Sequence, residues 1–208
     1  MRPLGRSVAA GVRWRGARSW FGSRCSVGIV AGMDAVTLDL PDGSVLLRRA
    51  TIADLSVIID LLADDPISAA RGDSADAGDR EAYEAAFAAI DRDPAQRLLV
   101  VVDSDGSSDS DGAGTVVATM QLTVIPGLAR RGASRLQIEA VRVSSSQRNR
   151  GIGAAMMRWA IEDARAAGVP LVQLTSDAAR VDAHRFYERL GFEASHVGFK
   201  YRILSEKN

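Results

Sequence analysis

The residues in this 208-residue sequence whose types and spacing best suit chemistry lie between Arg148 and Ala154, where the sequence reads RNRGIGA. An apolar strand pattern ends near Val143, a polar turn follows, and an amphipathic helix pattern begins after the glycines. The first turn of a helix leaves backbone N–H groups without intrahelical partners, at the positive end of the helix dipole. Glycines keep side chains away, so a phosphate can approach the backbone. The stretch therefore predicts a pyrophosphate site.

Three phosphate-binding patterns can be compared with this turn. A P-loop requires a Gly-Lys pair, which the sequence lacks. A dinucleotide fingerprint requires a third small residue, but Met156 stands there and the turn comes late in the chain. The third pattern, R/Q-x-x-G-x-G/A, fits Arg148 to Gly153 fully and resembles the acetyl-CoA loop of the GNAT superfamily of N-acetyltransferases. On these six residues alone, a helix start with two glycines and surface arginines remains an alternative.

A second motif supports the resemblance. The sequence His184 to Phe192, HRFYERLGF, resembles the F-Y-E-x-L-G-F segment that ends the last helix in this superfamily. The resemblance covers roughly 45–203 and is sharp only over 136–192. It implies an α/β fold with a mixed, mostly antiparallel sheet that splays at the strand before the pyrophosphate loop, with helices on both faces. It also implies acetyl-CoA as co-substrate and no metal.

The resemblance further implies which residues bind acetyl-CoA. Backbone groups of Val141 and Val143 would pair with the pantetheine arm, and Gln173 and Thr175 would line the facing strand. The pyrophosphate would be held mainly through backbone by the loop, which comprises Arg148, Asn149, Arg150, Gly151, Ile152, Gly153 and Ala154. We expect Arg148 and Arg150 also to pair with phosphates, with solvated surface charge as the alternative. For Asn149 the surface alternative is favoured.

Candidate proton carriers come from the second motif and from the strand that precedes the glycine turn. Tyr187 matches the family tyrosine that protonates the departing CoA thiolate, because a phenol is a suitable weak acid for that leaving group; a core tyrosine is the alternative. Glu139 is the candidate base, on the strand face that we expect it to share with Val141; its alternative is an arginine partner. One common family location for the base falls at Gln137, which cannot serve.

Other positions also bear on the chemistry of the site. His184 and His196 are weaker candidates for proton transfer. Arg180 stands where many relatives have Asn, and it reaches either a phosphate or an acidic residue. Cys25 lies in an unusual leader, which argues against a cysteinyl acetyl-enzyme and for direct transfer in a ternary complex.

The elements that must position these residues follow from periodicity and turn signals. Thr51 and Asp54 form a capping-box pattern ahead of the first helix. We expect strands at 45–49, 97–103, 115–125, 135–143, 170–175, 192–194 and 197–203, and helices at about 51–65, 79–93, 152–167 and 178–190. The acidic stretch 104–114 is expected to be a hairpin loop and not a calcium site, because the distal Glu is missing.

Composition limits the class of protein. Apolar residues make up 47% and charged residues 25%, with 26 basic and 26 acidic side chains, so nothing suggests a nucleic-acid partner. No apolar run approaches the roughly 20 residues of a membrane span, and we expect a cytoplasmic protein. Residues 1–32 hold six arginines and no acid. They are either a transit peptide or, as we favour, a disordered extension before one domain at 33–208.

The acceptor is the least determined part of the prediction. Residues 64–93 carry nine acidic residues against three arginines. An excess of negative charge at the acceptor mouth would favour a cationic amine, and a solvated acidic face is the alternative. We expect acetylation of a primary amine of a small molecule. A protein acetyltransferase acting on N-termini or lysines, or a non-catalytic acyl-CoA-binding regulatory module, are the alternatives. Homodimerisation through the sheet or the C-terminal strands is an expectation from the resemblance alone.

Overall fold

A single mixed sheet runs through the molecule in the computed structural model, which describes residues 35–65, 67, 76–104, 114–201 and 203. Its six strands lie side by side in chain order. They are β1 (Val36–Leu40), β2 (Gly43–Arg49), β3 (Gln96–Asp103), β4 (Thr115–Ile125), β5 (Arg135–Val143) and β6 (Val172–Leu174). Strands β1 to β5 pair antiparallel, whereas β5 and β6 pair parallel. The predicted mixed, mostly antiparallel sheet is confirmed.

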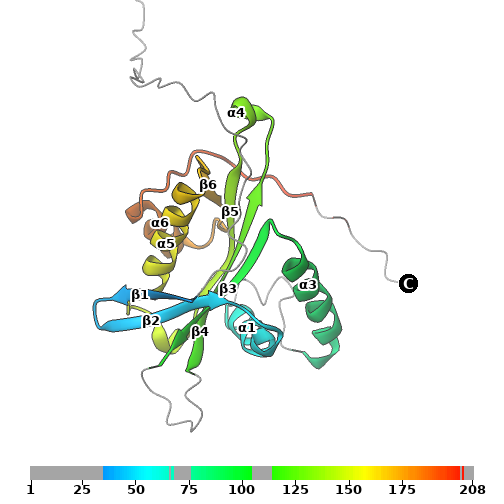
Figure 1. Ribbon diagram of the computed structural model, residues 1–208, viewed down its shortest axis with the longest axis vertical. Coiled ribbons are helices and arrows are strands. Elements are labelled where there is room, and N and C mark those ends of the chain that lie inside the picture. The colour runs from blue at the N-terminus through cyan, green and yellow to red at the C-terminus, as the bar shows by residue number, and fades with distance from the viewer. Residues whose placement is uncertain (1–34, 66, 68–75, 105–113, 202, 204–208) are drawn as a thin grey trace, which may run out of the picture.

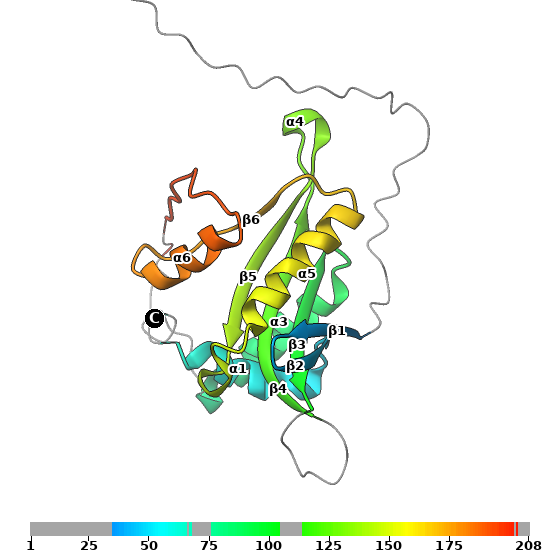
Figure 2. The same cartoon turned by 90° about the vertical axis from the view of Figure 1, so that its left-hand side faces the viewer.

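Helices cover both faces of this sheet (Figure 1, Figure 2). The helices among the described residues are α1 (Leu55–Ala63), α3 (Arg80–Arg92), α4 (Ala129–Gly132) at the tip of the β4–β5 hairpin, α5 (Ile152–Ala166) and α6 (Val181–Arg189), together with the short 3-10 helices η1 (Ile52–Asp54), η2 (Ala77–Asp79) and η3 (Ser145–Gln147). Helices α1 and α3 lie on one face, and α5 and α6 lie toward the other. The predicted helices on both faces are therefore confirmed.

Strand alternation divides the apolar core between the two faces. In β3, Leu99 and Val101 pack toward α5, where they join Met156 and other fully buried side chains. The alternate residues Leu98, Val100 and Val102 pack with the apolar sides of α1 and α3. Because β3 is buried on both faces, its sequence is a continuous apolar run.

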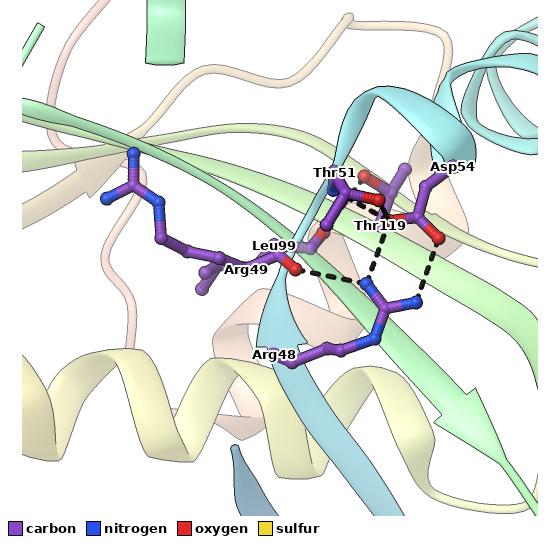
Figure 3. Close-up of polar contacts among 6 residues, drawn as sticks. All are labelled: Arg48, Arg49, Thr51, Asp54, Leu99 and Thr119. Atoms are coloured by element: carbon purple, nitrogen blue, oxygen red, sulfur yellow. Dashed lines mark hydrogen bonds and ion pairs between the residues drawn. The ribbon is translucent and has the colours of Figure 1, made fainter. Parts of the chain in front are cut away.

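A charged version of the predicted capping box lies at the start of η1, which leads directly into α1 (Figure 3). Asp54 accepts the backbone N–H of Thr51 at 2.7 Å, as the pattern predicted. The same carboxylate receives two hydrogen bonds of 2.8 Å from the guanidinium of Arg48. The pKa of Asp54 is lowered mainly by the Arg48 hydrogen bonds. The end of β2 is thereby joined to η1, the short helix that precedes α1.

Two parts of the predicted element order were wrong. Strand β1 was missed, although the Pro41-Asp42-Gly43 turn that follows it is a hairpin signal. The C-terminal hairpin expected at 192–194 and 197–203 does not form strands over the residues described there. Its alternating apolar side chains remain exposed, Phe199 by 92% and Tyr201 by 93%. Alternation predicts a strand only when a partner strand is present to receive its hydrogen bonds.

The expected boundary between an extension at 1–32 and a domain at 33–208 stays a prediction, since residues 1–34 lie outside the described part. Cys25 and most of the acidic loop at 104–114 also lie outside it.

Candidate functional site

The glycine turn joins the end of β5 to α5 through backbone that only certain residues tolerate. Asn149 has φ +68° and Gly151 has φ +89°, the left-handed region that glycine enters freely and asparagine enters more readily than most residues. The first helical hydrogen bond of α5 runs from the Ala155 N–H to the Gly151 carbonyl at 3.0 Å. Amides that precede this bond, those of Ile152, Gly153 and Ala154, have no helical acceptor. The turn therefore has the backbone geometry that the predicted anion cradle requires, and its binding of an anion stays a prediction.

Gly153 occupies a confined position in this cradle. A Cβ placed on it would lie 3.7 Å from Phe186 Cζ and 3.7 Å from Val143 Cγ2. These are ordinary contact distances, so alanine would fit there, whereas a large side chain would collide with α6 and the end of β5. Gly153 thus lies where β5, α5 and α6 converge.

Arg150 holds the glycine turn in place through contacts of its guanidinium group. Its Nε donates to Asp42 Oδ2 at 2.8 Å, its Nη1 donates to Gln147 Oε1 at 2.6 Å, and Nη1 also binds Asp103. The Asp103 side chain is only 4% exposed. The hydrogen bond from Arg150 lowers the pKa of Asp42, and the two carboxylates raise the pKa of Arg150. In this structure Arg150 connects the glycine turn to β3 and to the β1–β2 turn.

The other two polar residues of the loop face solvent. The side chain of Arg148 is 59% exposed, and its nearest carboxylate is Asp64 at 3.8 Å. Arg148 is therefore the loop arginine that is better placed to reach a phosphate. Asn149 is exposed as expected, and its contribution to the turn is its backbone conformation.

Strands β5 and β6 separate just before the turn. Their parallel pairing covers only three residue pairs, ending at Ile138 and Leu174. Strand β5 continues to Val143, and among the described residues none of its last five positions pairs with β6, whereas Glu139, Arg142 and Val143 pair with β4. Val141 and Val143 are partly buried against the α5 face. The splay expected from the resemblance is confirmed, and it leaves a strand edge beside the glycine turn.

A β-bulge in β5 overturns the predicted placement of Glu139. Gln121 pairs with Glu139 but Thr119 pairs with Arg142, so β5 holds one extra residue there. The extra residue is Ala140, with φ +52°. A bulge reverses the side-chain alternation beyond it. Glu139 therefore shares its face with Arg142, on the α1 side, and not with Val141. Glu139 is exposed, and Gln137 on the same face is buried and accepts a hydrogen bond from Gln173.

Tyr187 lies on α6 within an aromatic group. Its ring centroid is 5.2 Å from that of Phe186 and 6.0 Å from that of Phe192, both in edge-on arrangements. Burial raises the pKa of Tyr187, and the positive charges of Arg142 and Arg180 oppose that rise. The phenol therefore stays protonated at neutral pH, as a proton donor must.

Of the two partners expected for Arg180, a phosphate or an acidic residue, the structure shows an acidic residue. The Arg180 guanidinium donates two hydrogen bonds to Asp65, one of them 2.8 Å from Nη1 to Oδ1. Arg142 Nη2 lies 3.9 Å from the same carboxylate. Asp65 follows α1, Arg142 belongs to β5 and Arg180 precedes α6, so this cluster joins three elements.

The remaining candidates have structural partners. His184 Nε2 lies 2.8 Å from the Asp177 carbonyl, within the loop before α6. Exposed His196 contacts Ser195. Within the described ranges, no three His, Cys, Asp or Glu side chains gather closely enough to hold a metal ion. No helix in the same ranges is both long and apolar enough to cross a membrane.

Four of the nine acids behind the expected cationic acceptor form ion pairs with arginines in the structure. These pairs are Asp64 with Arg148, Asp65 with Arg180, Glu84 with Arg80, and Asp91 with Arg49. In addition, α3 packs against β3 at a distance from the splay. The acidic composition of 64–93 is therefore poor support for a cationic acceptor.

Sequence reasoning did not find Asp42, Asp65 or Asp103. Their partners are 108, 115 and 47 residues away along the chain, and no local pattern carries such pairings. The turn signal around Asp42 could have placed that residue at a hairpin, but not at the glycine turn.

Comparison with known proteins gives one family and several relatives. The model of the family described as "Acetyltransferase (GNAT) family" matches residues 58–192. A curated protein of Salmonella typhimurium, named aminoalkylphosphonate N-acetyltransferase, is 41% identical over 63 residues. That alignment covers 30% of this chain and 41% of the relative, so less than half of the curated protein is matched.

Solved structures extend the likeness over more of the chain. A protein described as a transcriptional regulator from Bacillus halodurans C-125 is 38% identical, with a TM-score of 0.68. A putative acetyltransferase from Agrobacterium tumefaciens str. C58 is 29% identical, with a TM-score of 0.59. Each comparison covers 76% of this chain and 99% of the other.

Proposed function

This chain belongs to the GNAT acetyltransferase family, and we propose from that premise that it transfers an acetyl group from acetyl-CoA to a primary amine of a small molecule. Small-molecule acetyl transfer is the activity named for the Salmonella relative. The observation that carries the proposal is the glycine turn placed beside the splay of β5 and β6. The glycine turn suits a pyrophosphate, and the splay suits an extended arm that ends in a thioester.

The residues fit acetyl-CoA in two ways. The amides of Ile152, Gly153 and Ala154 would hold the pyrophosphate, with Arg148 adding a cation from solvent. The edge of β5 at Val141 and Val143 would pair with the pantetheine amides as an added strand does. Arg150 would act indirectly, by fixing the turn through Asp42 and Asp103.

Two side chains would carry the protons. The acceptor ammonium would give one proton to Glu139, which is exposed and can return it to solvent. After the N–C bond forms and the C–S bond breaks, Tyr187 would protonate the thiolate and regain a proton from the acetylated nitrogen. The balance is one amide, one thiol and one proton released. The chain's single cysteine, Cys25, lies within residues 1–32, outside the family match at 58–192, which favours direct transfer in a ternary complex.

Two alternatives remain for the test. A protein acetyltransferase would use the same cofactor site on an N-terminus or a lysine. A non-catalytic acyl-CoA-binding regulatory module is favoured by one observation, namely that the Bacillus halodurans relative is described as a transcriptional regulator.

The deciding experiment titrates the full chain with acetyl-CoA and CoA by calorimetry, and then measures thiol release over small amines and peptides. Binding with release on small amines supports the proposal. Release only with peptides supports the protein acetyltransferase. Binding without release on any acceptor points to the regulatory module, and no binding at all refutes the cofactor site.

A further inference from the structure

The cluster of Asp65, Arg142 and Arg180 holds more positive than negative charge. Two guanidinium groups share one carboxylate, and Arg142 Nη1 also donates to the Val141 carbonyl at 2.8 Å. The three side chains are 17%, 20% and 22% exposed, in that order. The cluster is thus partly shielded from water, where charge interactions are stronger than on an open surface, but solvent still reaches it.

This cluster lies next to the groups to which we assign the proton transfers. Arg142 and Arg180 both act on the phenol of Tyr187, because their charges oppose the rise in its pKa. Glu139 lies on the same face of β5 as Arg142, because the bulge at Ala140 brings the two into the same register. Glu139, a carboxylate suited to an ammonium, and Arg142 therefore lie on the same face of β5. Arg180, the second arginine suited to an oxyanion, is linked to Arg142 through Asp65.

Resting on the proposed acetyl transfer, we propose that Arg142 and Arg180 bind an acid group of the acceptor while Glu139 receives its ammonium. The acceptor is then a small zwitterion, with a primary amine and an oxyanion separated by a short chain. Guanidinium groups bind carboxylate, phosphate and phosphonate through paired N–H donors. Asp65 occupies this position in the structure, and it keeps both arginines in place until an acceptor oxyanion shares or replaces it.

Under this proposal, removal of the Asp65 charge should strengthen binding of the acceptor instead of weakening it. In an ordinary structural ion cluster, removal of one partner weakens everything that depends on the cluster. Here the carboxylate also competes with the acceptor for the same donors. Asp65→Asn keeps a hydrogen-bonding side chain of similar shape and removes the competing charge, so binding of an acidic acceptor should become tighter.

The test compares three amines of similar length: 2-aminoethylphosphonate, 3-aminopropionate and propylamine. The kcat/KM of the full chain with each is measured at saturating acetyl-CoA. We expect at least one acid-bearing amine to exceed propylamine by about 10- to 100-fold, the effect of one or two charge-assisted hydrogen bonds. The first two amines also distinguish a tetrahedral from a planar oxyanion.

The variants make the test specific. Arg142→Met and Arg180→Met should each raise KM for the preferred acidic amine about 10-fold or more, and should lower the ratio of kcat/KM for that amine to kcat/KM for propylamine by a similar factor. Asp65→Asn should lower that KM. Arg185→Met is the matched control, because Arg185 lies on the exposed side of α6 with Asp182 as its partner, and it should change neither substrate. Calorimetry with acetyl-CoA checks that each variant still forms the cofactor site.

Three results would overturn the inference. Equal loss of kcat on charged and uncharged amines would show that the arginines serve Tyr187 or the thiolate. Propylamine used as well as both acidic amines would show that no acid subsite exists, although the acetyltransferase proposal would stand. Thiol release with no small amine would refute the acceptor class of the proposed function, and the inference would fail with it.

Discussion

Matched substitutions at two left-handed glycines, Gly151 and Gly168, can distinguish an effect on acetyl-CoA binding from an effect on the stability of α5. Gly151 has φ +89° at the start of α5, and Gly168 has φ +70° just beyond its end. Alanine at either position should cost about 1–2 kcal/mol, because a Cβ is strained in this region. A Cβ at Gly151 would also meet Pro41 Cδ at 3.4 Å, whereas nothing lies within 4 Å of one at Gly168.

The two variants should therefore lose similar stability and differ in function. In a chain of this size, 1–2 kcal/mol corresponds to a fall in Tm of about 2–8 °C, measured by thermal unfolding without ligand. Only Gly151→Ala should weaken acetyl-CoA binding in calorimetry, because strain there moves the amides of the cradle. Gly168→Ala should bind as the parent chain does. Unchanged affinity of Gly151→Ala, together with the expected loss of stability, would refute the assignment of this turn to the pyrophosphate.

Three further predictions concern individual positions. Tyr187→Phe should lower kcat by about 10²- to 10⁴-fold with little change in acetyl-CoA affinity, and equal activity would remove Tyr187 as the acid. In the parent chain, the raised pKa of Tyr187 should place the alkaline loss of kcat above pH 10, and the same group contributes stability that is lost as pH rises through its folded-state pKa. Gly153→Trp should abolish CoA binding in calorimetry while Gly153→Ala retains folding, since the Cβ itself makes only ordinary contacts; unchanged affinity of the Trp variant would exclude the cradle. Asp54→Asn should lower the free energy of unfolding in urea at pH 7 by about 2 kcal/mol, because a cap and charged hydrogen bonds are lost. Because the pKa of Asp54 is lowered, the difference in unfolding free energy between parent and variant should shrink as pH falls below 3.8. A difference that stays constant with pH would contradict the role of the Asp54 charge.

Local patterns were sufficient to predict β4 and β5 to the residue, and α5 to within one residue of its end. These segments combine strong alternation or helical spacing with clear turn residues, so neighbours in sequence determine the structure. The glycine turn belongs to the same class, since its left-handed positions fall on Asn149 and Gly151.

Two misplacements have physical causes that sequence patterns do not carry. The bulge in β5 falls on Ala140, a residue with no preference for a positive φ, so the reversal that moves Glu139 could not be foreseen. The C-terminal residues Val197, Phe199 and Tyr201 alternate as a strand does, but they are exposed without a neighbouring strand in the described part. The homodimer expected from the resemblance stays a prediction.

The ion pairs of the site could not be predicted, because charge pairing over long sequence distances follows from the fold and not from local spacing. Arg150 was expected to meet a phosphate, and it is instead engaged with Asp42 and Asp103. Arg180 was recognised as unusual for the family, but only the fold shows that its partner is Asp65.

The β1–β2 hairpin has a consequence for the segment that carries the family signature. That signature begins at residue 58, whereas the hairpin ends before it and supplies Leu38, Val45 and Leu47 to the core. A fragment that began at the signature would expose the β2-facing edge of β3. Its run of Leu98 to Val102, apolar and uncharged, would then offer unpaired backbone groups to other chains, which is a strong tendency toward edge-to-edge aggregation. The two strands outside the signature thus keep the most aggregation-prone strand of the molecule in the interior of the sheet.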